Sequence, residues 1–352
     1  MQSIKEIKQL FEQAEKEQWN ALFSQYKTDE RAGVQKLITQ YENKLVKYRK
    51  EQERLYRMLE FERKYGDEFS CICGIDEAGR GPFAGPVVAG AVILPKGLTI
   101  EGLNDSKQVS AKKREELYDE IKEKAVSVGI GMSSPARIDE INILQATYEA
   151  MQHAVEDLDV VPDLLLNDAV TIPLIPIRQV GIIKGDARSL SIAAASIMAK
   201  VTRDRMMVEY AELYPEYGFE KNKGYGSAEH REALKKYGPC PIHRSTFIHN
   251  WISKEGISMA YEKEKKTAVA LEYTPGEQAP KVIASGRGYL ADKIIDVAKE
   301  ENVPIHKDEK LARSLSVLDI GEYIPQELYS IVAEVLVFVD DMDKIQSKVK
   351  KK

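Results

Sequence analysis

Two adjacent acids, Asp76 and Glu77, are the residues whose types and position most directly suggest chemistry in this sequence. They follow the apolar run from Cys71 to Ile75 and precede a Gly-Arg-Gly turn at 79–81. Because neighbouring side chains of a strand point to opposite faces, the two acids cannot both face the core. Carboxylates near a strand end suit hard divalent cations such as Mg²⁺ or Mn²⁺, and a glycine turn lets backbone approach a phosphate or a sugar. A capped strand with a solvated acid pair explains this stretch alone equally well.

Two further acids end later apolar runs of the chain. Asp168 follows the run 164–166, and Asp186 follows the run 180–183. Proteins with α/β folds commonly place their sites at the ends of buried strands. Taken locally, Asp168 could equally begin a turn. If the fold brings these acids to the first pair, they form a carboxylate cluster suited to metal ions.

Polar and basic residues near these acids could contact an anionic substrate. Ser106 and Lys107 lie in a polar turn and could hold a phosphate, although Asp105 could instead cap that turn. Tyr225 is flanked by glycines and follows Lys223. An aromatic ring on such a loop can stack on a sugar or a base, or it can simply pack the loop.

The elements that must position these residues follow from apolar periodicity. The small residues in the stretch 189–200 predict a helix that packs closely on a sheet, with Lys200 adding positive charge to its carboxyl-terminal part. A strand-rich start followed by alternation indicates an α/β fold, a mixed sheet with helices packed on it. Strands are expected near 70–76, 86–94, 126–132, 162–167 and 179–184, and helices near 110–125, 136–158, 190–213 and 227–237.

The first 68 residues form a separate, charged segment with helical stripes. One stripe covers Ile4 to Ala14, a second covers Val34 to Tyr48, and a third segment covers Glu51 to Tyr65. These predict a helical N-terminal extension. It either adds contacts to a substrate or partner or, the interpretation we favour, forms a solvated helical hairpin.

Composition limits the classes of protein to which this chain can belong. Its 352 residues favour two or three domains, and a net charge of −5 excludes a basic surface overall, so nucleic acid would have to bind local patches. Three cysteines give no disulfide framework and indicate a reduced compartment. The sequence shows neither a signal segment nor an apolar run long enough to cross a bilayer. We therefore expect a cytoplasmic protein without a membrane interaction.

Five motifs in order resemble bacterial type 2 ribonuclease H, or ribonuclease HII. They are GIDEAGRGPFAGPVVAGAVIL, LNDSK, LLLNDA, KGDARSLSIAAASIMAKVTRDR and NKGYGSAEHREALKKYGPCPIHRSTF, and they span about residues 70–248. The helical segment before them also resembles the extension of Bacillus-type members. The resemblance implies an RNase H-like fold, cleavage of RNA in RNA–DNA hybrids, and nicking 5′ of a single ribonucleotide embedded in duplex DNA.

The resemblance also implies roles for particular residues. Four acids would hold two Mg²⁺ or Mn²⁺ ions, and the products would carry 5′-phosphate and 3′-hydroxyl ends. Ala169 stands where many members have glycine, but the acid before it is retained. The Gly-Arg-Gly turn would read the ribose 2′-hydroxyl, and Tyr225 would sit at the RNA–DNA junction. The expected catalytic metal ligands are Asp76, Glu77, Asp168 and Asp186, and the expected substrate contacts are Gly79, Arg80, Gly81, Asn104, Ser106, Lys107, Ser196, Lys200, Lys223 and Tyr225.

The last part of the chain resembles a different family. The segments AVALEY, APKVIASGRGYLADKIIDVAKEENVPI, LARSL and IGEYIPQELYSIVAEVLVFV are similar to the cytoplasmic domain of the export-gate switch protein of flagellar and type III secretion systems. The Asn-Pro-Thr-His self-cleavage motif and the membrane helices of that family are missing, so neither property is carried over. We expect strands near 269–273 and 281–284, helices near 289–302 and 326–345, and either a protein-binding domain with an unknown partner or a passive fused domain.

Together these patterns predict a metal-dependent endoribonuclease with four parts. These are the N-terminal extension 1–68, a catalytic domain 69–250, a charged linker 251–266, and a small α/β domain 267–352. The expected partners are RNA–DNA hybrids and duplex DNA that contains ribonucleotides. Two alternatives stay open: a secretion-related interaction protein with an inactive nuclease domain, and a protein that binds nucleic acid without turnover.

Overall fold

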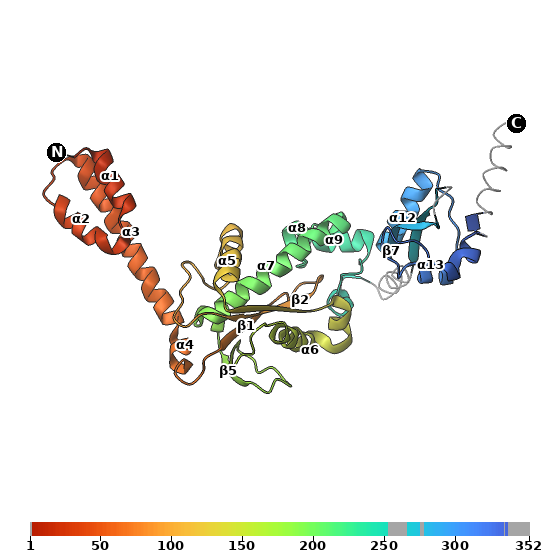
Figure 1. Cartoon of the computed structure of the whole chain (residues 1–352), viewed down its shortest axis with the longest axis horizontal. Coiled ribbons are helices and arrows are strands. Elements are labelled where there is room, and N and C mark those ends of the chain that lie inside the picture. The colour runs from red at the N-terminus through yellow and green to blue at the C-terminus, as the bar shows by residue number, and fades with distance from the viewer. Residues whose placement is uncertain (1, 253–265, 275–277, 334, 337–352) are drawn as a thin grey trace. The chain divides into compact units, whose positions relative to one another are not determined.

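The computed structural model describes residues 2–252, 266–274, 278–333, 335 and 336 (Figure 1). The chain divides into two compact units, which are described separately. The first unit comprises 1–80, 87–133 and 141–203, and the second comprises 81–86, 134–140 and the chain from residue 204 onward. The expected linker 251–266 lies almost wholly outside the described residues.

A five-stranded mixed sheet forms the centre of the first unit. Its strands are β1 (Ile72–Ala78), β2 (Val87–Ile93), β3 (Ser127–Ser133), β4 (Leu164–Asp168) and β5 (Arg178–Ile182). They lie in the order β3-β2-β1-β4-β5, with β1, β2 and β3 antiparallel and β1, β4 and β5 parallel. The mixed sheet predicted from the sequence is confirmed, and each strand lies within a few residues of its predicted position.

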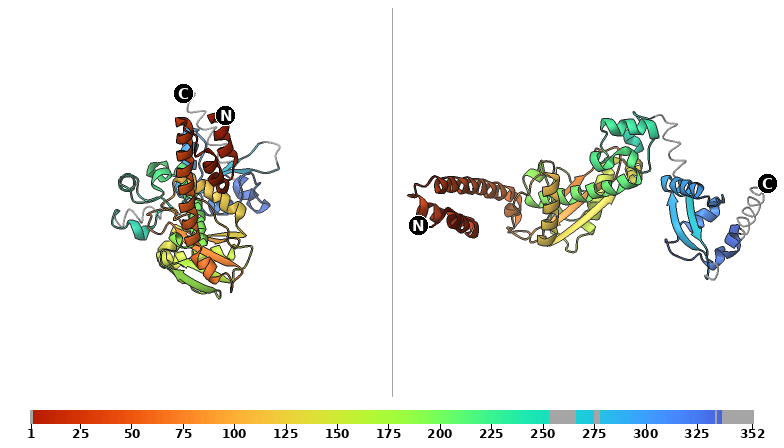
Figure 2. Two further views of the ribbon diagram at one scale, coloured as in Figure 1. Left: turned by 90° about the vertical axis from the view of Figure 1, so that its left-hand side faces the viewer. Right: turned by 90° about the horizontal axis from the view of Figure 1, so that it is seen from above.

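Helix α7 (Leu190–Leu213) packs its backbone directly on one face of the sheet (Figures 1 and 2). A Cβ atom added to Gly74 on β1 would lie 2.0 Å from the carbonyl carbon of Ser191, and one on Gly90 of β2 would lie 2.5 Å from the carbonyl oxygen of Ala195. Only glycine opposite small helical residues permits this approach. The close packing predicted from the small residues of α7 is therefore present.

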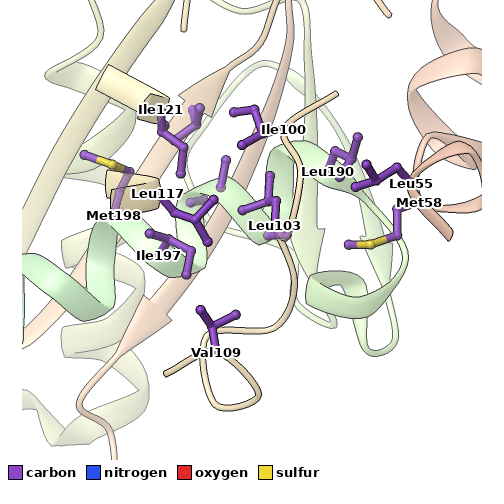
Figure 3. Packing of buried hydrophobic residues seen from close by; sticks show 14 of the residues in the cluster. Leu55, Met58, Ile100, Leu103, Val109, Leu117, Ile121, Leu190, Ile197 and Met198 are labelled. Carbon is purple, nitrogen blue, oxygen red and sulfur yellow. The ribbon is translucent and has the colours of Figure 1, made fainter. Parts of the chain in front are cut away.

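The main hydrophobic core lies between this face of the sheet, α7 and α5 (Ala111–Lys124). Helix α3 (Ala32–Met58) of the N-terminal segment also contributes to it, through Leu55 and Met58 (Figure 3). The end of helix α3 is thus buried in the same core as side chains of the sheet, α5 and α7. The side chains labelled in Figure 3 are Leu55, Met58, Ile100, Leu103, Val109, Leu117, Ile121, Leu190, Ile197 and Met198.

Helix α6 (Pro135–Glu156) packs against β3, where a Cβ on Gly131 would lie 2.0 Å from the carbonyl oxygen of Ala150. The sequence predicted one uninterrupted helix here, but the helix breaks at Asn142, whose φ is 68°. The Asn142 side chain accepts hydrogen bonds from the backbone N–H groups of Leu144 and Gln145. It therefore caps a new helical start, as asparagine often does.

The N-terminal segment contains α1 (Ile4–Gln13), η1 (Lys16–Gln18), α2 (Trp19–Tyr26), α3 (Ala32–Met58) and α4 (Glu60–Tyr65). Helix α1 was predicted, whereas α2 was not. The second and third predicted segments are largely one 27-residue helix, α3, which ends at Met58. A small core of apolar side chains from α1, α2 and α3 holds this bundle together.

The second unit contains the short elements η3 (Pro215–Tyr217), α8 (Phe219–Asn222), α9 (Ala228–Tyr237) and α10 (Ser245–Ile248). Their buried side chains form a separate core that includes aromatic rings. Segment 81–86 joins this core through hydrogen bonds with the loop that carries Tyr225 and with Ile242.

The described part of the tail also has a core of its own. It comprises the antiparallel strands β6 (Thr267–Glu272) and β7 (Lys281–Arg287), with α12 (Tyr289–Glu300), α13 (Glu309–Leu315) and η4 (Gln326–Leu328). Helix α13 was not predicted. The long helix expected at 326–345 begins as η4 and continues through residue 333, and its remainder lies mostly outside the described residues.

Candidate active site

Asp76 and Glu77 lie near the end of β1 and point to opposite faces of the sheet. Asp76 pairs with Gly90, the residue over which the α7 backbone passes, so its side chain faces α7. It is 6% exposed. Its carboxylate accepts hydrogen bonds from the Glu77 N–H at 2.8 Å and from the Ser196 hydroxyl. Burial and these two donors fix the Asp76 side chain.

Asp168 ends the neighbouring parallel strand β4 at the same edge of the sheet. The last printed pair of β1 and β4 is Ile75 with Asn167, so the next position along each strand aligns Asp76 with Asp168. Parallel strands keep aligned residues on the same face. Asp168 therefore projects towards the same side as Asp76.

Asp186 lies on the short helix η2 (Gly185–Ala187), which follows β5 after a turn at Lys184 with φ 56°. The Gly185 N–H donates to Oδ1 of Asp168 at 2.8 Å. That hydrogen bond fixes the position of η2, and with it Asp186, against the end of β4. Three acids from distant parts of the sequence are thus held at one edge of the sheet.

The electrostatics of the acids show that they affect one another. Burial raises the pKa of Asp76 well above its usual value, and the Glu77 and Asp168 carboxylates raise it further. Burial also raises the pKa of Glu77, where Arg80 opposes the effect and Asp168 adds to it. The pKa of Asp186 is raised by burial and then by Asp105 and Asp168, against Lys107. A nearby cation would relieve this repulsion.

Lys107 brings positive charge to the acids from the turn before α5. Burial alone would lower its pKa, but the carboxylates of Asp105, Asp76, Asp186 and Asp168 together raise it. Asp105 also caps the turn, since its Oδ1 accepts from the Lys107 N–H at 2.9 Å. This hydrogen bond supports the capping role considered for Asp105, whereas phosphate binding by Ser106 and Lys107 stays a prediction.

Ser106 and Ser196, both expected to contact the substrate, are buried and linked to each other by a 2.9 Å hydrogen bond between their hydroxyls. They connect the turn before α5 to α7 and lead to Asp76. Asn104 in the same turn is hydrogen-bonded to Gln108 at 3.3 Å, and Lys200 is partly buried on α7. Direct contact of these residues with a substrate stays a prediction.

The glycine turn after β1 begins in the first unit. Gly79 has φ 95°, a conformation that favours glycine, and so lets the chain turn directly after the acids. Arg80 donates to Oε1 of Glu77 at 3.1 Å while its side chain stays partly exposed. The arginine thus neutralises part of the acid charge and retains a solvent-facing guanidinium.

The donor set fits a hard divalent cation in its chemistry, because it consists of carboxylate oxygens whose mutual repulsion an ion would offset. In the side-chain positions of the described residues, however, no three His, Cys, Asp or Glu groups are close enough together to bind one ion. Asp76, Glu77 and Asp168 direct carboxylate oxygens to protein donors instead. Binding an ion would require these side chains to turn.

The sequence did not indicate that Glu62, on α4, supports this region. Its Oε1 accepts from the Ser189 hydroxyl at 2.6 Å and from the Ser191 N–H at 3.0 Å. Glu62 therefore caps the start of α7, close after η2 in the sequence. The only available signal was a glutamate among many in a charged helix, which carries no information about a partner 127 residues later.

In the second unit, Tyr225 lies beside the last glycine of the turn. A Cβ on Gly81 would lie 3.8 Å from Cε1 of Tyr225, and the tyrosine is 48% exposed. The Gly224 carbonyl accepts from the Phe83 N–H at 2.8 Å, which holds the two loops together. Lys223 has φ 50° and donates to the Glu220 carbonyl at 2.7 Å. The exposed ring is available for stacking.

A mixed sheet with carboxylates at the ends of adjacent strands makes this an α/β protein whose arrangement suits metal-dependent hydrolysis. Comparison with known sequences is more specific. Residues 73–251 match the sequence model of the family Ribonuclease HII, and residues 3–66 match that of the Ribonuclease HII N-terminal domain. The chain belongs to the ribonuclease HII family, whose members are divalent-metal-dependent endoribonucleases acting on RNA–DNA hybrids.

Individual known proteins are similar to this chain to different extents. The ribonuclease HII of Lachnoclostridium phytofermentans is 65% identical over 228 residues, which cover 65% of this chain and 89% of that protein. The Bacillus subtilis ribonuclease HII is 51% identical and covers 70% of this chain and 96% of that protein. The crystal structure of ribonuclease H2 from Pyrococcus horikoshii is 31% identical, with a TM-score of 0.43, and covers 50% of this chain and 93% of its own.

The tail matches a second family. Residues 265–339 match the model described as the FlhB HrpN YscU SpaS Family. The solved PscU C-terminal domain is 31% identical, with a TM-score of 0.20, and covers 20% of this chain and 94% of its own. The tail is therefore similar to this family over residues 265–339. In the described parts of the chain, none of the helices is both long and apolar enough to span a membrane.

Proposed function

We propose that this protein nicks duplex DNA on the 5′ side of a single embedded ribonucleotide, in addition to hydrolysing the RNA strand of RNA–DNA hybrids. Asp76, Glu77, Asp168 and Asp186 are the residues we assign to two Mg²⁺ or Mn²⁺ ions. When bound, such ions supply an activated water and stabilise the leaving oxygen in an in-line displacement. Products with 5′-phosphate and 3′-hydroxyl ends follow from this chemistry.

The observation that carries the proposal is the placement of Asp76, Asp168 and Asp186 at the ends of β1 and β4 and on η2, which the strand register and the hydrogen bond from Gly185 to Asp168 hold together. Each of Asp76, Glu77 and Asp186 has a pKa raised in part by another carboxylate, and Asp168 contributes to all three. Acids that interact at a partly buried strand edge suit a metal site better than a set of solvated charges would. Lys107 offsets part of the negative charge of the group.

The residues around the acids support recognition of the sugar and phosphate. Gly81 is exposed, and Arg80 presents a partly exposed guanidinium. We assign to this turn the contact with the ribose 2′-hydroxyl, and to the exposed ring of Tyr225 stacking at the RNA–DNA junction. Asn104, Ser106, Lys107, Ser196, Lys200 and Lys223 are assigned to substrate binding, either directly or by supporting the residues that contact it.

The test is cleavage of a labelled DNA duplex that contains one ribonucleotide, with Mg²⁺ or Mn²⁺ supplied. We expect Asp76→Asn to lower kcat/KM by at least about a hundredfold, because it removes an essential negative charge. Asp119→Asn on the exposed surface of α5 is the matched control and should cut like the wild type. Ligation and polymerase extension of the products identify their ends. Absence of a nick by folded wild-type protein would refute the proposal.

For the tail, we propose a protein-interaction domain with its boundary after the linker, and we retain 1–68, 69–250, 251–266 and 267–352 as the parts of the chain. Support comes from the match to a family that includes export-switch domains and from the separate core of the tail. A pull-down with residues 266–352 as bait, compared with residues 1–252, tests this. Capture of the same proteins by both fragments would contradict it.

A further inference from the structure

Behind the loop of Tyr225 lies a pair of buried histidines that the assignment above does not use. His230 on α9 is fully buried, and His243 is 5% exposed. Their Nε2 atoms are 2.9 Å apart. The aromatic rings of Tyr217 and Phe219 lie edge-on to the pair, with ring centroids 4.9 Å from His243 and 5.3 Å from His230 respectively. A pair so enclosed must have its polar atoms satisfied by the protein.

The group at the Tyr225 end fixes where the protons lie. At one end, Nδ1 of His243 lies 2.9 Å from the backbone nitrogen of Cys240, 3.1 Å from its Sγ and 3.2 Å from its carbonyl oxygen, so Cys240 offers both a donor and an acceptor. At the other end, Nδ1 of His230 lies 2.9 Å from the carbonyl oxygen of Tyr225, which can only accept. His230 therefore carries its proton on Nδ1, and its Nε2 accepts from the Nε2–H of His243. With one proton on each ring, each of the three hydrogen bonds has one donor and one acceptor. The donors point the same way, from the Cys240 N–H through His243 and His230 to the Tyr225 carbonyl.

The alternative arrangements do not satisfy these atoms. Moving the His243 proton from Nε2 to Nδ1 would turn the two acceptors Nδ1 of His230 and Tyr225 O towards each other. A second proton on His230 would place its Nε2–H against the Nε2–H of His243 at 2.9 Å, and one on His243 would place its Nδ1–H against the Cys240 N–H, also at 2.9 Å. All four ring nitrogens are used in hydrogen bonds, and no group of three metal-binding side chains occurs in the described residues, so the pair is not a metal site.

We propose that His230 and His243 form a neutral hydrogen-bond relay that positions Tyr225 for the substrate; this rests on the substrate-binding role proposed above for Tyr225. The relay ends on the carbonyl of Tyr225, which also accepts from the Ser227 N–H at 2.8 Å, so the backbone of the exposed tyrosine is held by two donors. Both histidines are positioning residues, because they act through Tyr225. The relay ties the backbone that carries the Tyr225 ring to the buried core.

Two nearly isosteric substitutions test the relay. In His230→Asn the amide nitrogen can occupy the Nδ1 position and still donate to Tyr225, whereas in His230→Gln it occupies the Nε2 position. We expect kcat/KM for a single embedded ribonucleotide to stay within about threefold in the first variant, and to fall by about tenfold or more in the second, because small misplacements of a substrate contact are costly. Each variant is also made in the Tyr225→Ala background, where neither should reduce cleavage further.

Equal losses with and without the Tyr225 side chain would show a merely structural role and overturn the relay, as would full activity of His230→Gln. Full activity of Tyr225→Ala alone would instead refute the substrate role of Tyr225, and the relay would then have nothing to position. If the His230 variants do not fold, His243→Gln, which keeps the Nε2 donor, and His243→Asn, which does not, give the same comparison. ¹⁵N spectra of the folded enzyme should show the Nδ1–H form of His230 and the Nε2–H form of His243, and the opposite forms would overturn the proposal.

Discussion

At the scale of single residues, the buried histidine pair makes stability depend on pH. The pKa of His243 is lowered to about 3, first by burial and then by the neighbouring His230, against an opposing hydrogen bond with Cys240. An exposed histidine has a pKa near 6.5. Between these two pH values, the unfolded chain therefore binds a proton at His243 that the folded chain does not bind. The stability that His243 confers is complete above pH 6.5 and is lost as the pH falls towards 3.

We expect this residue alone to reduce the free energy of unfolding by about 2 kcal/mol between pH 7 and pH 5. Other groups titrate in the same range, so the relevant quantity is the difference between the wild type and His243→Gln in urea unfolding at each pH. The variant should show a shallower loss of stability on acidification. His249→Gln, at an exposed histidine, is the control and should follow the wild type. Identical pH dependence in all three proteins would contradict the expectation.

At the scale of elements, the contact between α7 and β1 leaves no space for a side chain. We expect Gly74→Ala to reduce the free energy of unfolding by about 3 kcal/mol, because the added methyl group would lie 2.0 Å from helix backbone and the helix would have to move. Gly181→Ala on β5 places the same methyl group no closer than 3.3 Å to another atom. It should cost less than about 1 kcal/mol. Thermal unfolding compares the two variants. Similar melting temperatures would contradict the predicted difference in stability.

Much of the sheet and its helices could be predicted because their residues repeat with the period of each element. The strands β1 to β5 and the helices α5, α7 and α9 fell close to the predicted ranges. The kink at Asn142 was missed because one asparagine in an apolar helical pattern does not reveal whether its side chain will cap a new turn. Helix α2 was missed because its eight residues are too few to show a clear period.

The site was predictable in part for a related reason. Asp76, Asp168 and Asp186 each end an apolar run, and parallel strand ends meet at one edge of a sheet. The supporting contacts were not predictable, because they join residues far apart in sequence. Glu62 with Ser189 and His230 with His243 depend on how elements pack, and single glutamates and histidines carry no local sign of a distant partner.

At the scale of the whole molecule, the two ends of the chain should tolerate truncation differently. The hydrophobic core of the tail shares no residue with the core around Phe219, whereas Leu55 and Met58 of the N-terminal segment lie in the main core of the nuclease. We expect residues 1–252 to cut with kcat/KM within about twofold of the full chain. Residues 69–352 should lose most of their stability, since each buried leucine or methionine contributes about 1.5–3 kcal/mol.

Circular dichroism measures the folding of both fragments, and cleavage of the DNA duplex with one ribonucleotide measures their activity. A stable, fully active 69–352 fragment would show that the N-terminal segment is dispensable for folding. A poorly active 1–252 fragment would show that the tail takes part in catalysis.

Strand β6 begins at Thr267, directly after Lys266, and the chain there lacks the Asn-Pro-Thr-His sequence at which its export-type relatives are expected to cut themselves. Both segments, the nuclease and the tail, are made as one chain in equal numbers, and without that scission they stay covalently joined after translation. Any protein captured by the tail becomes tethered to the enzyme. The local concentration of that protein near a nucleic acid substrate would then be set by its attachment to the tail of the enzyme and not by its abundance in the cell.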